Sequence, residues 1–196
     1  MIRECVGGSG ASVPRHCGMK HTYLSISFGE HTLALPLVEV HKVARMVSIT
    51  PVGEAAPRGM LGVVNLGGRV VPVFDPRSRL GLPSKAMDAS DQLVFVSAGD
   101  RLIALWVDEA GDVFRAVIPE DSEAQGSAPE PRIAPGESVW KELHGVAGIV
   151  TLEDGLVVIQ DMDAFLSQEE AQLLDAALDA LDMGDAGHGA DNEVSR

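Results

Sequence analysis

The most regular pattern in the chain is a set of short apolar runs separated by glycine-rich turns. Residues 63–66 and 70–74 are mainly β-branched or apolar, and Gly67 and Gly68 separate them. This spacing predicts a tight hairpin whose central residues need positive φ, which glycine adopts without steric cost. Because Pro72 lacks an N–H group, its strand is expected at a sheet edge or near a bulge.

A short capped helix is predicted directly after this hairpin. Asp75 can accept hydrogen bonds from free N–H groups at a helix start, and Pro76 suits the first helical position. Gly81 suits the end of the same turn. Replacing the capping carboxylate by alanine is expected to cost on the order of 1 kcal/mol of stability.

The same unit recurs at 148–166, offset by 86 residues, with six identical positions. Asp161 then occupies the position of Asp75, and the same cap is predicted there. An upstream pair, 29–45 and 99–115, also shares six identities, at an offset of 70. The order A-B-A′-B′ predicts two copies of one β-rich half. The difference between the offsets falls near the Pro/Gly/Ser-rich stretch 119–138, which predicts a long surface loop.

The N-terminal region lacks a strand pattern. Residues 1–21 form a Gly/Ser-rich leader that is expected to be disordered, with Met19 as an alternative start. Alternating Leu24, Ile26 and Phe28 then mark the first strand. A repeat-containing domain is therefore expected over 22–181, with subdomains at about 22–88 and 89–166.

A helix is predicted at the C-terminal end of that domain. Ser167 and Glu170 form a capping box, and leucines at helical spacing follow over 168–181. Such stripes more often pack on a core than bind a partner, so the helix is expected to lie across the sheets. Residues 182–196 are expected to form a disordered tail.

Composition limits the possible partners. The chain has 196 residues, of which 45% are hydrophobic and only 4% aromatic, so Val, Leu, Ile and Ala must build its core. Each half has about 70 residues, which is marginal for a lone core, so the halves should pack together. A net charge of −14 and a pI near 4.7 argue against nucleic acid and anionic membrane surfaces. No apolar run approaches the roughly 18 residues of a spanning helix.

A search for catalytic chemistry finds no complete set. Gly62 and Gly67 have phosphate-loop spacing, but Gly68 stands where the essential lysine must be. No nucleophile elbow, dinucleotide fingerprint or zinc-protease motif occurs. Asp161 and Asp163 can be considered as paired carboxylates, although capping already explains the first. We therefore predict no cofactor; a β-barrel enzyme or small-molecule binder is the alternative from another class.

Two further groups of polar residues give weak signals. Cys5, His16, Cys17 and His21 could be considered for zinc, but their spacing fits no standard site, and free thiols suit a reducing cytosol. Asp108 and Glu109, which follow a strand, are expected to face solvent.

The stretch LGVVNLGGRVVPVFDPRSRLGLP resembles the motif of CheW-like chemotaxis coupling proteins, which reads roughly GVxNLRGxVVPVxDLRxxxGL. Three further segments agree in order: HTLALPLVEVHKVARM, RLIALWVDEAGDVFR and HGVAGIVTLEDGLVVIQDMDAFLSQEEAQLLDAAL. The match covers about residues 22–181. It implies an all-β dominated fold of two pseudo-twofold-related, five-stranded, SH3-like β-barrels with short helical turns and a C-terminal helix.

The resemblance also implies a non-enzymatic adaptor. Such proteins couple the cytoplasmic tips of chemoreceptors to the regulatory domain of a CheA-type histidine kinase, which has the same fold. The implied location is the cytoplasm, at receptor arrays reached through partners. Because one fold supports several roles, a CheW-like scaffold or competitor that binds without activating is the alternative.

Site residues carry over only where this sequence matches the motif. The implied receptor or kinase contacts are Val40, Lys42, Val64, Asn65, Leu66, Gly67 and Arg69, with Gly68 as the turn glycine and Asp75 and Asp161 as structural caps. Two positions depart: Lys42 stands where the family often has glutamate, and Gly67 where it has arginine. These departures predict weak affinity for a receptor tip of the usual charge pattern. Arginine at 67 is expected to be tolerated and slightly stabilising.

Overall fold

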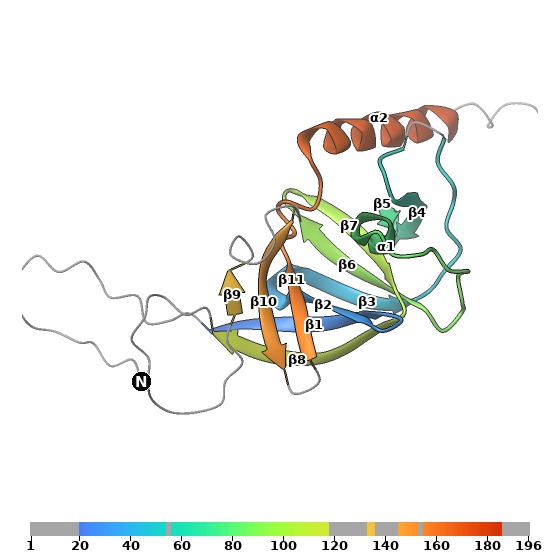
Figure 1. The fold of residues 1–196 in the computed structure, drawn as a ribbon. Coiled ribbons are helices and arrows are strands. Elements are labelled where there is room, and N and C mark those ends of the chain that lie inside the picture. Colours follow the sequence, from blue (N-terminus) through green and yellow to red (C-terminus); the bar gives the residue numbers. More distant parts are fainter. Residues whose placement is uncertain (1–19, 54–55, 118–132, 136–144, 153–154, 186–196) are drawn as a thin grey trace, which may run out of the picture.

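The computed structural model describes residues 20–53, 56–117, 133–135, 145–152 and 155–185. They form two β-sheets, two short helical turns and one long helix (Figure 1). One sheet has the strand order β8 (Glu109–Val117), β1 (Lys20–Phe28), β2 (His31–Pro36), β11 (Gly155–Gln160), β10 (Val146–Leu152) and β9 (Ile133–Pro135). The other has the order β3 (Val40–Arg45), β6 (Gln92–Ala98), β7 (Arg101–Val107), β5 (Arg69–Phe74) and β4 (Met60–Leu66).

Each sheet takes strands from both halves of the sequence. In the five-stranded sheet β5 runs parallel to β7, and in the six-stranded sheet β11 runs parallel to β2. The remaining named-strand pairs are antiparallel, mostly between neighbours along the chain. The sequence halves 22–88 and 89–166 therefore do not form one sheet each, because each exchanges a hairpin with the other.

The register of the parallel pairs shows the internal repeat in three dimensions. Val73 pairs with Ala104 in one sheet, and Ile159 pairs with Ala34 in the other. These four residues are related by the offsets of 86 and 70 that the sequence comparison found. The predicted repeated, mostly β architecture with a C-terminal helix is confirmed.

Among the described residues the strand order of each sheet is open, so strand pairing alone does not close the expected SH3-like barrels. In the five-stranded sheet, an isolated bridge between Thr50 and Val63 places the segment after β3 beside the opposite edge strand. In the six-stranded sheet, the equivalent contact is Ala134 with Ile149, between β9 and β10. In both halves, the segment that follows the third strand of the repeat therefore lies beside the first strand of the repeated hairpin, β4 or β10.

The strand β9 corrects one expectation. It lies inside 119–138, for which a surface loop was predicted from composition. Ile133 to Pro135 pair with β10 because the otherwise open edge of that strand offers backbone hydrogen-bonding groups. The other residues of that stretch, the leader up to residue 19 and the tail from 186 lie outside the described residues.

The buried apolar residues form three clusters, of which the central one joins the two sheets. The central one includes Leu24, Ile26 and Phe28, the alternating residues that predicted the first strand. In β6, Val94 belongs to this central cluster, whereas Leu93 faces the separate core of the five-stranded sheet. Strands buried on both faces explain why several of these segments are nearly continuous apolar runs.

The β4–β5 hairpin has the predicted turn. Gly67 and Gly68 have φ values of 62° and 92°. Arginine at 67 would therefore have to adopt a left-handed backbone, so the expectation that it would stabilise is wrong. Pro72 lies on an interior strand, near a bulge between Met60 and Gly62. Pro72 lies opposite Val63 of β4. The N–H and C=O groups of Val63 are both hydrogen-bonded to Thr50, on the other side of β4, so the missing N–H of Pro72 interrupts no hydrogen bond to β4.

The helical turns follow the two repeated hairpins differently. Asp75 caps α1 (Pro76–Leu80) by accepting from the Arg77 N–H, and Gly81 ends it in the left-handed conformation. Asp161 accepts from the N–H groups of Asp163 and Ala164, at 3.0 and 3.2 Å, but only a turn follows. The third short element, η1 (Leu37–Glu39), links β2 to β3 and so joins the two sheets.

The long helix α2 (Gln168–Asp185) lies across one end of the molecule (Figure 1). Its predicted capping box is present: Ser167 and Glu170 each accept a hydrogen bond from the backbone N–H of the other. Leu174 is buried in the central cluster. The helix extends four residues beyond the predicted end at 181.

Candidate functional site

The candidate contact residues lie at two places on the five-stranded sheet. Val40 and Lys42 are on the edge strand β3, and the others are on the β4–β5 hairpin at the opposite end of the strand order. Lys42 is exposed, whereas Val40 is half-buried against the central cluster. The two sets share no strand pair; the Thr50–Val63 bridge joins β4 to the segment that follows β3.

Within the hairpin, only some side chains are available to a partner. Val64 is buried in the sheet's own core and Leu66 packs against it. Asn65 and Arg69 are exposed. The Asn65 side-chain oxygen accepts from the Gly68 N–H at 2.7 Å, so this asparagine also stabilises the turn. The hairpin contacts available to a partner are therefore Asn65, Arg69 and the two glycines.

Sequence reasoning missed a network of charges that joins the two halves. Arg77 is 3% exposed, and its guanidinium lies between the rings of Phe28 and Trp106, at 5.2 and 4.6 Å from their centroids. It is ion-paired with Asp75, at 3.1 Å, and with Asp108. A buried guanidinium needs such partners, because an unpaired buried charge is strongly destabilising.

The same network holds the segment that connects the halves. The Lys85 ammonium donates to Asp91 at 2.7 Å and to Asp108. The Trp106 indole N–H donates to Asp91 at 2.9 Å. Asp108 was expected to face solvent, and that expectation is wrong, because the fold brings Arg77 and Lys85 against it. The only sequence signal was the position of Asp108 after an apolar strand.

The network shifts the pKa values of its members. Burial alone would raise the pKa of Asp108 and Asp91, but the hydrogen bonds from Lys85 and other donors outweigh it and lower both. The hydrogen bonds to Asp108 and Asp91 raise the pKa of Lys85. All three groups are therefore charged at neutral pH, and Lys85 is ion-paired with both carboxylates.

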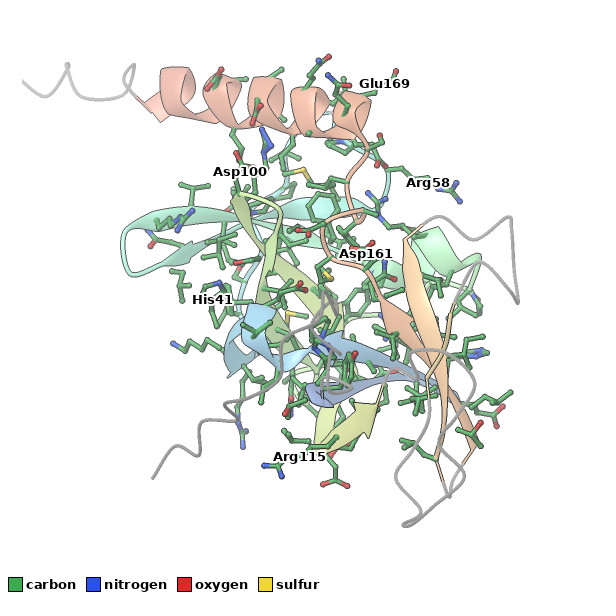
Figure 2. The ribbon with its side chains drawn as sticks, turned by 90° about the vertical axis from the view of Figure 1, so that its left-hand side faces the viewer. His41, Arg58, Asp100, Arg115, Asp161 and Glu169 are labelled. Carbon is green, nitrogen blue, oxygen red and sulfur yellow. The ribbon has the colours of Figure 1, made fainter. Side chains whose placement is uncertain are left out.

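A cavity of about 280 Å³ opens beside this network. Phe28, Arg77, Leu82, Lys85 and Asp108 are among its lining residues. Of its lining groups, Arg77, Lys85 and Asp108 are paired with each other, whereas Glu30 and His31 are exposed and lie outside this network. Asp161, which Figure 2 labels, serves as a turn cap in the other half.

Metal and membrane features can be judged for the described residues only. Within them, no three His, Cys, Asp or Glu side chains gather in a way that could hold a metal ion. Among the zinc candidates, Cys5, His16 and Cys17 lie outside these residues, and His21 is part of β1. None of the described helices has the length and apolar character needed to cross a bilayer.

Several large apolar side chains point outward, and they recur in both halves. Val43 and Val113 are 40% and 54% exposed, and the offset of 70 relates them. Val70 and Leu156 are 46% and 68% exposed, and the offset of 86 relates them. Val38, on η1 between the sheets, is 90% exposed. Single outward apolar residues are common on folded proteins, so the feature specific to this chain is that they recur at equivalent positions of the two halves.

Comparison with known proteins gives a consistent result. The CheW-like domain model matches residues 22–170. The chemotaxis protein CheW of Bacillus subtilis is 31% identical over 140 residues, which cover 71% of this chain and 82% of that protein. The chemotaxis protein CheW of Klebsiella aerogenes is 23% identical over 153 residues, covering 78% and 86%.

A solved structure supports the same relationship. The scaffolding protein TtCheW from Thermoanaerobacter tengcongensis superposes with a TM-score of 0.57 at 26% identity, covering 72% of this chain and 89% of that one. The repeated two-sheet arrangement defines the class of protein, a mostly β domain built from two related halves. The chain belongs to the CheW-like domain family.

Proposed function

We propose that this protein is a chemotaxis adaptor that couples the cytoplasmic tips of chemoreceptors to a CheA-type histidine kinase. The observation that carries the proposal is the family match over residues 22–170, together with the CheW fold. The similar Bacillus and Klebsiella proteins are chemotaxis proteins, and the similar solved structure is a scaffolding protein. An adaptor of this kind acts through surfaces and needs no catalytic group.

The proposed contact surface consists of the exposed candidates on β3 and on the hairpin. We propose Lys42, Asn65, Gly67 and Arg69 as direct contacts to a receptor or kinase, with the half-buried Val40 beside Lys42 on β3. Val64 and Leu66 contribute by packing inside the sheet and not by direct contact. The proposed location is the cytoplasm, at receptor arrays that the protein reaches through its partners.

A second candidate is a scaffold or competitor that binds without activating. The departures at Lys42 and Gly67 favour it, because charges at an interface select partners. A small-molecule binder could use the 280 Å³ cavity, but the pairing of Arg77, Lys85 and Asp108 there favours a structural role.

Reconstitution of kinase activity tests the proposal. The purified protein is combined with a CheA-type kinase, with or without a membrane-embedded chemoreceptor, and autophosphorylation is measured. A coupling adaptor raises kinase activity only when the receptor is present. A scaffold or competitor binds the kinase or receptor but leaves activity unchanged or lowers it. If the protein co-purifies with neither partner, the adaptor proposal is rejected.

A further inference from the structure

The β3 strand presents an open backbone edge. In the described part of the chain it pairs only with β6. The Met46 N–H donates to the Asp91 carbonyl at 2.9 Å, in register with the β3–β6 ladder. Because backbone groups in an antiparallel pair alternate in direction, the N–H and C=O groups of Val43 and Arg45 point away from β6. They are therefore free to pair with a further strand.

The side chains along this edge are basic and apolar. His41, Lys42, Val43 and Arg45 are all exposed, and no acidic residue lies among them. His41 is hydrogen-bonded to Ser97 on the neighbouring strand, which leaves Lys42 and Arg45 as the outward charges. Neither of these two forms an ion pair with another described residue. On a chain of net charge −14 this is an unusual local surplus of positive charge.

The equivalent edge in the other half has a different charge. By the offset of 70, Val113 and Arg115 on β8 correspond to Val43 and Arg45, and all four are exposed. Asp112 stands in place of Lys42, and Glu109 is also exposed on that strand. Figure 2 places His41 of β3 and Arg115 of β8 on separate parts of the surface. The two edges thus share backbone geometry and an apolar residue but differ in charge.

We propose that the β3 edge binds an acidic extended segment of a partner protein, which adds to the five-stranded sheet as a further strand. Main-chain hydrogen bonds at Val43 and Arg45 would supply affinity, as in other cases of strand addition. Carboxylates on the incoming strand would face Lys42 and Arg45, and its apolar residues would cover Val43 and Val47, which are 40% and 52% exposed. This inference rests on the proposed adaptor function. The kinase regulatory domain is the probe, because a partner built of strands can supply one.

The first test compares one substitution at two equivalent positions. Arg45→Glu and Arg115→Glu reverse the same charge on β3 and on β8. The kinase regulatory domain is titrated with wild type and each variant at low and moderate salt. We expect Arg45→Glu to weaken binding about tenfold at low salt and less at higher salt, whereas Arg115→Glu leaves it within about twofold. Adding Lys42→Glu to Arg45→Glu should weaken binding further. Thermal denaturation confirms that these exposed substitutions leave the protein folded.

The second test detects the added strand itself. Amide hydrogen exchange is followed residue by residue in the free protein and in the complex. Strand addition should slow exchange at the Val43 and Arg45 amides and leave those of Val113 and Arg115 unchanged. Weakened binding by Arg45→Glu without this protection would mean side-chain contact alone, which overturns strand addition.

The remaining outcomes separate this inference from the proposed function. Equal effects of Arg45→Glu and Arg115→Glu overturn the inference but leave the adaptor function standing. If Arg45→Glu removes only receptor binding, the edge contacts a helical receptor tip. If it removes only self-association, measured by light scattering, the edge contacts a second copy of the protein. Either result overturns the inference. If wild type binds neither kinase nor receptor, the adaptor function itself is rejected.

Discussion

Asp75 and Asp161 make the same backbone hydrogen bond in the two halves of the protein. Each donates its N–H over 2.8 Å to the carbonyl of a glycine, Gly59 in one half and Gly145 in the other. Both glycines have positive φ, 80° and 84°. The repeated pattern therefore specifies a common corner, where the first strand of each hairpin begins beside the end of the second.

The side chains of the two aspartates make different interactions, which predicts that their substitution has unequal effects on stability. Asp75 is buried and ion-paired with the buried Arg77, whereas Asp161 accepts only backbone hydrogen bonds in an exposed turn. Asp161→Ala should cost about 1 kcal/mol, as for a lost cap. Asp75→Ala should cost about 3 kcal/mol, because it also breaks a buried pair. Urea denaturation measures both. Equal costs would contradict a stabilising role for the Asp75–Arg77 pair.

Local pattern explains why much of this fold could be predicted. The Gly67-Gly68 turn, the Asp75 cap and the Ser167–Glu170 box each depend on residues close in sequence. The turn and the two helix caps can therefore be predicted without knowledge of the tertiary structure. The two repeats were found in the same way, as matching local patterns.

Long-range pairing explains what was missed. The parallel contact of Val73 with Ala104 joins segments that no local pattern connects, so the exchange of hairpins between halves was not foreseen. Asp108 was expected to face solvent because Arg77 and Lys85, which lie against it, approach only once the chain folds. The candidate contacts fall on one edge strand and one hairpin, but the burial of Val64 followed from tertiary packing.

The conformation of Gly67 predicts a cost for restoring the arginine of the family pattern. With φ at 62°, a side chain at this position would occupy the left-handed region, although no atom crowds it. Gly67→Arg should therefore destabilise by about 1 kcal/mol, whereas Gly67→Asn should cost less because asparagine tolerates this conformation. Thermal denaturation of both variants measures the difference. A higher Tm for Gly67→Arg would show that the turn adopts another geometry.

Arg79 of α1 contacts the beginning of α2. Its guanidinium donates to Glu170 at 2.9 Å and lies over the Phe165 ring, 4.5 Å from the centroid. Burial would raise the pKa of Glu170, but hydrogen bonds from Ser167 and Arg79 outweigh it and lower that pKa. A lowered folded pKa means that this stabilisation is present above the unfolded pKa and is lost as pH falls through the folded value.

Glu170→Ala should accordingly destabilise by about 1 to 2 kcal/mol at neutral pH, since it removes both an ion pair and half of a capping box. The matched control is Asp175→Ala on the same helix, which breaks a more exposed ion pair with Arg101 of β7. That variant should lose no more than about 0.5 kcal/mol. Urea denaturation at neutral and acidic pH gives both values. Similar losses would mean that Glu170 does not secure the helix.

Glu39 gives a prediction of opposite sign. It lies on η1 between the sheets, and its Oε2 is buried without a hydrogen-bond partner among the described residues. Burial raises the pKa of Glu39, and the nearby charges of Asp163 and Asp161 raise it further. Because the folded pKa is above the unfolded one, Glu39 favours folding only while protonated, and that contribution is lost as pH rises through the folded value.

Glu39→Gln should therefore raise the Tm at pH 7 and give no gain below the unfolded pKa of the carboxyl, where wild-type Glu39 is protonated in both states. The control Glu109→Gln changes the exposed equivalent in the other half and should alter stability by less than about 0.5 kcal/mol. Tyr23 offers a second measurement. It is the only tyrosine in the chain, and its pKa is raised by burial and by the charge of Glu39. Ultraviolet titration should show this pKa lowered by Glu39→Gln and unchanged by Glu109→Gln. A lower Tm at pH 7 would instead mean that the ionised carboxylate makes a stabilising contact.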